Sequence, residues 1–110
     1  MKVNIYGLKS CDTCKKALKT LQEAGHDVTY TDVRANGIGA DKLAKFQCEF
    51  GQALINTRST TWRDLSADKR TRPVLQLLLE YPTLMKRPVI DADGVLSLGW
   101  GKDVQDRFRP

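Results

Sequence analysis

The sequence predicts an α/β fold, with parallel strands near its beginning and an antiparallel pair near its end. Three observations predict this class: a strand–helix–strand pattern before residue 34, helical segments in the middle of the chain, and two apolar runs joined by Asp93-Gly94. A helical crossover between two strands makes them parallel, whereas a tight turn makes them antiparallel. At 110 residues we expect one domain with a modest core.

The N-terminal third alternates between β-favouring and helical patterns. Lys2–Tyr6 is expected to be a strand that ends at Gly7. Asp12–Ala24 is expected to be a helix, because its apolar residues form one stripe opposite its lysines and Gly25 follows as a stop. Residues 28–33 alternate loosely between apolar and polar types, which predicts a second strand. A right-handed crossover would make the two strands parallel.

The middle of the chain is predicted to be mainly helical. Asp41–Phe50 carries apolar residues at helical spacing, and Gly51 ends it. Asn56–Thr61 is polar and predicted to be a loop, and a short helix is expected after Ser66. Pro73 then opens an apolar helical stretch that stops at Pro82.

The last third predicts a β-hairpin followed by a helix. Pro88–Ala92 and Val95–Leu98 are β-favouring runs, and the Asp-Gly between them suits the positive φ angles of a tight turn. Lys102–Phe108 can form a closing helix. This order of elements is that of a thioredoxin-like fold, in which a Cys-x-x-Cys motif opens the first helix.

Cys11 and Cys14 form such a motif at the start of the first predicted helix. A helix N-terminus favours negative charge and Lys15 and Lys16 reinforce it, so a thiol there has a pKa of roughly 3.5 to 7.5. We expect Cys11 to attack an oxidised centre such as a disulfide, and Cys14 to resolve the mixed disulfide. Half of a zinc site, with Cys48 and His26 as further ligands, and a structural pair are the alternatives, and no metal is expected.

Two arginines are candidate anion-binding residues. The guanidinium groups of Arg58 and Arg87 present forked donors that suit an oxyanion or carboxylate and also favour a nearby thiolate. Both can equally be ordinary surface arginines. Arg87 precedes Pro88, and in thioredoxin-like folds a cis-proline faces the cysteine pair, which would bring Arg87 to the site. Cys48 is interpreted as a small apolar residue.

The charge and the apolar content of the sequence limit the classes of binding partner and the cellular location that we expect. There are 18 basic and 13 acidic residues, a net charge of +5 that favours anionic partners. The basic residues are scattered and lack a nucleic-acid-binding motif, so no direct nucleic-acid contact is expected. No apolar run is long enough to span a membrane and no signal peptide is evident, so the expected location is the cytoplasm.

The order of motifs resembles the arsenate reductase (ArsC)-like family, closest to its YffB-type subgroup and similar to the Spx regulators. The matching segments are Ile5–Gly7 with Cys11–Ala17, Leu54–Leu65, Lys86–Ile90 and Leu98–Trp100. The resemblance implies a thioredoxin-like (glutaredoxin-like) core in a single domain 1–110, with a helical insertion over roughly 41–84. It also implies Cys11 as the nucleophile, with Arg58 and Arg87 as oxyanion-binding arginines and Pro88 as the cis-proline.

This resemblance implies a thiol-disulfide oxidoreductase that uses glutathione as co-substrate, whose carboxylates can pair with Lys15, Arg58 or Arg87. Arsenate reductases carry a third arginine after the terminal strand, where this chain has Leu98–Gly101, and a His-Asn pair where it has Gly7 and Leu8. Losing a charged donor costs on the order of 1.5 to 3 kcal/mol, which disfavours arsenate as the substrate. The alternative is an Spx-like regulator that binds RNA polymerase and uses its cysteines as a redox switch. We expect a monomer without a bound cofactor.

Overall fold

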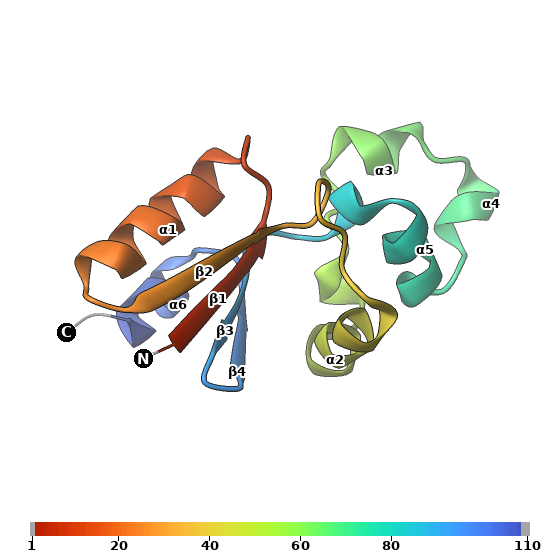
Figure 1. The fold of residues 1–110 in the computed structure, drawn as a ribbon. Coiled ribbons are helices and arrows are strands. Elements are labelled where there is room, and N and C mark those ends of the chain that lie inside the picture. The colour runs from red at the N-terminus through yellow and green to blue at the C-terminus, as the bar shows by residue number, and fades with distance from the viewer. Residues whose placement is uncertain (1, 109–110) are drawn as a thin grey trace. The chain divides into compact units, whose positions relative to one another are not determined.

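The computed structural model describes residues 2–108 and divides the chain into two compact units (Figure 1). The first unit combines the residues up to Asn36 with those from Arg87 onward, and the second is Gly37–Lys86. The predicted insertion, residues 41–84, falls within the second unit. That all of the chain forms a single domain stays a prediction.

A four-stranded sheet is the centre of the first unit. It contains β1 (Lys2–Gly7), β2 (Asp27–Asp32), β3 (Val89–Ala92) and β4 (Val95–Leu98), in the spatial order β2-β1-β3-β4. β1 and β2 are parallel, whereas β3 is antiparallel to both β1 and β4 (Figure 1). This topology confirms the predicted thioredoxin-like α/β fold.

The hairpin between β3 and β4 forms where the sequence predicts it. Asp93 and Gly94 have φ angles of 51° and 90°, the left-handed conformation that a tight two-residue turn requires. The Gly94 N–H also donates a 2.8 Å hydrogen bond to the Asp91 carboxylate. The Asp-Gly pair therefore fixes the register in which Ala92 lies opposite Val95.

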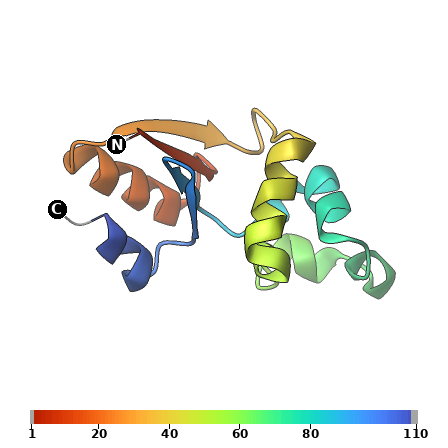
Figure 2. The ribbon, with the colours of Figure 1, turned by 90° about the horizontal axis from the view of Figure 1, so that it is seen from below.

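Two helices cover one face of this sheet. Figures 1 and 2 show α1 (Asp12–Glu23) and α6 (Lys102–Arg107) on the same side of the strands. Leu21 of α1 and Val104 of α6 pack on one buried cluster, completed by Val3, Ile5, Ile90 and Ala92 from β1 and β3. The apolar stripe predicted for the first helix is therefore the face that closes the core.

The second unit is helical. It contains α2 (Ala40–Phe50), the 3-10 helix η1 (Gly51–Leu54), α3 (Thr60–Asp64), α4 (Ala67–Arg70), α5 (Val74–Glu80) and the 3-10 helix η2 (Pro82–Leu84). Its buried apolar side chains include Leu43, Phe46, Leu54, Leu77, Leu78, Leu84 and Met85. Within residues 2–108, no helix is both long and apolar enough to cross a membrane.

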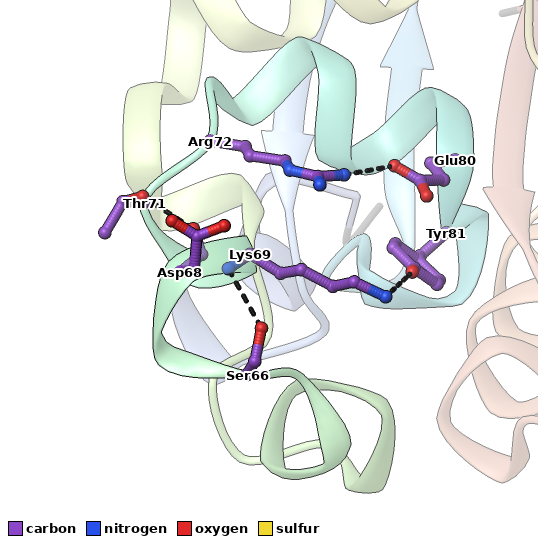
Figure 3. A network of polar contacts seen from close by, with 7 residues as sticks. All are labelled: Ser66, Asp68, Lys69, Thr71, Arg72, Glu80 and Tyr81. Carbon is purple, nitrogen blue, oxygen red and sulfur yellow. Dashed lines mark hydrogen bonds and ion pairs between the residues drawn. The ribbon is translucent and has the colours of Figure 1, made fainter.

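Side-chain caps and polar contacts define the short helices of this unit. The predicted loop Asn56–Thr61 ends early, because the Ser59 hydroxyl accepts a 3.2 Å bond from the Trp62 N–H and starts α3 at Thr60. Ser66 caps α4 in the same way. Figure 3 shows two further links to the end of α5, a hydrogen bond from Lys69 to Tyr81 and an ion pair between Arg72 and Glu80.

Candidate active site

The loop between β1 and α1 places Cys11 at the N-terminus of the helix. The Cys11 N–H donates to the Leu8 carbonyl over 3.1 Å, and the Cys11 carbonyl accepts the Lys15 N–H over 3.0 Å. Cys11 is therefore the N-cap residue of α1, and it has extended backbone dihedrals. Unpaired N–H groups at this position favour a negatively charged sulfur.

The two cysteines of the motif have different environments. Cys11 is half-buried, whereas the side chain of Cys14 has no exposed surface, and neither is in a disulfide. Burial raises the pKa of Cys11, but hydrogen bonds from the Cys14 N–H and thiol, together with the Arg87 guanidinium, outweigh it and lower this pKa below its usual value. Burial, and then the charge of Cys11, raise the pKa of Cys14 to about 11. The motif therefore combines an acidic thiol with a strongly protonated one.

Arg87 contacts Cys11, and Pro88 is the next residue in the chain. The Arg87–Pro88 peptide bond is cis, and the buried Pro88 accepts the Gly99 N–H at its carbonyl over 2.8 Å. The half-buried Arg87 side chain hydrogen-bonds to Cys11. Cys11 and the Arg87 guanidinium, which contact each other, thus both belong to the first unit.

The structure describes the local surroundings of the remaining candidate residues. Arg58 is exposed in the second unit, where its N–H donates to Asn56 Oδ1 over 3.1 Å and its carbonyl accepts from Arg63. Lys15 is exposed on α1, and Cys48 is exposed on α2. Their roles stay predictions. His26, the other zinc-ligand candidate, packs its ring edge-on against Phe108.

Within residues 2–108 the structure contains no group of three or more His, Cys, Asp or Glu side chains that could hold a metal ion.

Asp32 is a supporting residue that the sequence analysis missed. The residue is 7 % exposed, and its carboxylate accepts 2.9 Å hydrogen bonds from the N–H groups of Lys9, Arg34 and Ala35. These bonds, led by the one from Lys9, lower the pKa of Asp32. The loop that carries Cys11 is therefore anchored to the end of β2.

Tyr30 of β2 was missed as well. Its hydroxyl donates a 2.6 Å hydrogen bond to the Leu8 carbonyl, and it also reaches Cys14. The predicted parallel pairing of the first two strands was a partial signal in the sequence, and the structure pairs Gly7 with Asp32, so that the end of β2 lies beside the loop that follows β1. Side chains at the carboxyl ends of neighbouring parallel strands gather at one edge of a sheet.

The fold and this arrangement define a thioredoxin-like protein with a cysteine pair at the start of its first helix, an arginine in contact with Cys11, and a cis-proline that follows this arginine in the chain. Comparison with known proteins identifies the particular group. The ArsC family profile matches residues 6–108, and the chain belongs to the ArsC family.

Three relatives illustrate this membership. An uncharacterized protein of Haemophilus influenzae is 41 % identical over 96 % of this chain and 98 % of its own length. The Global transcriptional regulator Spx of Staphylococcus epidermidis is 32 % identical over 98 % of this chain and 87 % of its own. A solved structure described as YFFB (PA3664) protein superposes with a TM-score of 0.87 at 31 % identity, covering 96 % of both chains.

Proposed function

We propose that this protein is a thiol-disulfide oxidoreductase in which Cys11 is the nucleophile, Cys14 is the resolving thiol and glutathione is the reductant. The observation that carries the proposal is the contact between Arg87 and the half-buried, acidic Cys11, with the protonated Cys14 behind it. The reducing cytoplasm is the expected setting, and the protein is expected to act as a monomer.

In the first step the Cys11 thiolate attacks a substrate disulfide. A bond forms between Cys11 Sγ and one substrate sulfur, and the substrate S–S bond breaks. The other sulfur leaves as a thiolate that takes a proton from solvent. Arg87 favours this step because its guanidinium lowers the pKa of Cys11 and so increases the share of the reactive thiolate.

In the second step Cys14 resolves the mixed disulfide. At pH 7 a thiol with a pKa of about 11 is ionised to only about one part in 10⁴, since the difference is about 4 pH units. Part of that elevation comes from the negative charge of Cys11, which disappears once Cys11 is in the mixed disulfide. The Cys14 pKa therefore falls after the first step, so the attack by Cys14 follows it.

The cycle closes with two molecules of glutathione. The attack of the Cys14 thiolate forms the Cys11–Cys14 bond and releases the second substrate sulfur as a thiol. Two glutathione thiols then reduce this disulfide and become glutathione disulfide, so two electrons pass from glutathione to the substrate. The glutathione carboxylates would pair with Arg58, Arg87 or Lys15.

The test is turnover of a glutathionylated peptide with reduced glutathione, recycled by glutathione reductase and NADPH. Wild-type protein is expected to turn over, Cys11→Ser to lose all activity, and Cys14→Ser to accumulate a mixed disulfide at Cys11. Cys48→Ser is the matched control, because that exposed cysteine lies on α2. A folded wild-type protein that forms no mixed disulfide with any low-molecular-weight disulfide would refute the proposal. The same assay with arsenate in place of the glutathionylated peptide tests whether this protein reduces arsenate.

A second candidate function follows from the likeness to the Spx regulator. Its motivation is the 32 % identity over 98 % of this chain. In this case the Cys11–Cys14 pair would be a redox switch that controls binding to RNA polymerase. Pull-down with the polymerase α subunit, using oxidised and reduced protein, distinguishes the two functions: absence of binding in both states would remove this candidate.

A further inference from the structure

The hydroxyl of Tyr30 lies at the buried sulfur of Cys14. Tyr30 is half-buried on β2, opposite Ile5 of β1, and its hydroxyl donates a 2.6 Å bond to the Leu8 carbonyl. The same hydroxyl hydrogen-bonds to the Cys14 side chain, and the Leu8 N–H bonds to the Cys14 sulfur. The Cys14 sulfur therefore lies beside an N–H group and a hydroxyl that do not belong to its own helix.

Gly7 makes this close approach possible. A Cβ atom at position 7 would lie 2.5 Å from Cys14 Sγ and 3.0 Å from the Tyr30 hydroxyl oxygen. The backbone of Gly7 cannot easily move aside, because its carbonyl accepts the Val33 N–H over 2.9 Å. The sulfur and the phenol thus share a space that exists because residue 7 has no side chain.

Tyr30 acts here as a hydrogen-bond donor and not as a base. Burial, followed by the charges of Cys14 and Cys11 from α1 and Asp32 from β2, raises the pKa of Tyr30. The phenol therefore keeps its proton throughout the neutral range. A phenol has one O–H, so it can serve either the Leu8 carbonyl or a charged sulfur.

We propose that Tyr30 is the hydrogen-bond donor that stabilises the Cys14 thiolate during the resolving step, and that Gly7 keeps the space for this contact open. The inference rests on the proposed function. In the reduced protein the Cys14 thiol donates to the Cys11 sulfur, and the Tyr30 O–H donates to Leu8. Once Cys11 is in a mixed disulfide, Cys14 releases its proton to solvent, and the Tyr30 O–H turns toward the Cys14 thiolate.

The bonds of the step remain those of thiol-disulfide exchange. The Cys14 thiolate forms a bond to Cys11 Sγ, the bond from Cys11 Sγ to the substrate sulfur breaks, and the leaving thiolate takes up a proton. Tyr30 transfers no proton. Its contribution is a charge-assisted hydrogen bond to a sulfur that is buried in the reduced protein.

The experiment separates the two steps by rapid mixing with glutathione disulfide, acid quenching and mass spectrometry. In Tyr30→Phe, formation of the mixed disulfide at Cys11 is expected to stay within about twofold of wild type. Conversion to the Cys11–Cys14 disulfide is expected to slow by roughly tenfold or more, with its pH–rate profile moved to higher pH. Tyr81→Phe is the control, because it removes a phenol that bonds to Lys69 in the second unit.

Gly7→Ala provides an independent variant that keeps the phenol and intrudes on the contact. It is expected to slow the resolving step as well, whereas the control Gly39→Ala, where a Cβ would meet nothing within 4 Å, is expected to leave it unchanged. In Cys11→Ala, adding Tyr30→Phe is expected to raise the titration midpoint of Cys14.

Two outcomes overturn the inference. One is an unchanged resolving step and pH–rate profile in Tyr30→Phe. If that variant does not fold, an unchanged resolving step in folded Gly7→Ala has the same consequence. A lower melting temperature with an unchanged pH–rate profile would show a purely structural tyrosine. Failure of the wild-type protein to form a mixed disulfide would instead refute the proposed function.

Discussion

Replacing Asp32 with asparagine is expected to loosen the loop that carries Cys11. Oδ1 accepts the N–H groups of Arg34 and Ala35, and Oδ2 accepts that of Lys9, each at 2.9 Å. An asparagine can keep the first two bonds but turns an NH₂ group toward the Lys9 N–H. Losing one charge-assisted hydrogen bond and weakening two others is expected to lower the free energy of unfolding by about 2–4 kcal/mol.

The pH dependence follows from the lowered pKa of Asp32. A carboxyl group that is more acidic when folded stabilises the protein above its unfolded pKa of about 3.9, and this contribution is lost as the pH falls through the folded pKa. The free energies of unfolding of wild type and Asp32→Asn are therefore expected to differ most near neutral pH. The difference is expected to shrink as the pH falls through the folded pKa of Asp32.

Urea denaturation across this pH range, with amide hydrogen exchange in β1 as a local probe, measures the effect. Asp27→Asn is the matched control, because it removes the same charge from an exposed position at the other end of β2. Equal stability of wild type and Asp32→Asn near neutral pH would refute the reasoning. A difference in the free energy of unfolding that stays constant down to the most acidic pH would refute the claim that the ionised Asp32 carboxylate contributes the stability.

Two further predictions concern Arg87 and Ser59. Arg87→Gln is expected to raise the Cys11 pKa, because a hydrogen-bonding cation is removed, and to slow alkylation of Cys11 by iodoacetamide near pH 6; an unchanged alkylation rate would contradict the contact. Ser59→Ala is expected to cost about 1 kcal/mol in urea denaturation through the lost α3 cap, and a stability equal to wild type would show that the cap is dispensable.

Local sequence patterns were sufficient for most of the fold. Asp93-Gly94 forms the turn because few residue types tolerate its positive φ angles, and that requirement is visible in the sequence. The stripe that includes Ala17 and Leu21 is buried as expected. The predicted loop at Asn56–Thr61 was partly wrong, because the cap at Ser59 starts a helix of only five residues, too short for a periodic pattern.

The candidate site was predictable only in part. The acidity of Cys11 follows from its position at a helix start, which the sequence indicates. The contributions of Tyr30 and Asp32 depend on the register between β1 and β2, and a shift by one residue would turn both side chains to the other face. The position of the Cys14 sulfur depends on the absent side chain at Gly7, because a Cβ there would lie 2.5 Å from it, and no local pattern indicates this.

The central claim is that the two thiols of the motif are poised for successive steps. Titration of both thiols in the reduced protein, by alkylation and mass spectrometry of each cysteine across pH, tests it most directly. We expect the pKa of Cys11 to be lowered from that of an ordinary cysteine and Cys14 to stay protonated up to a midpoint of about 11. Two ordinary midpoints, or a Cys14 more acidic than Cys11, would contradict the account.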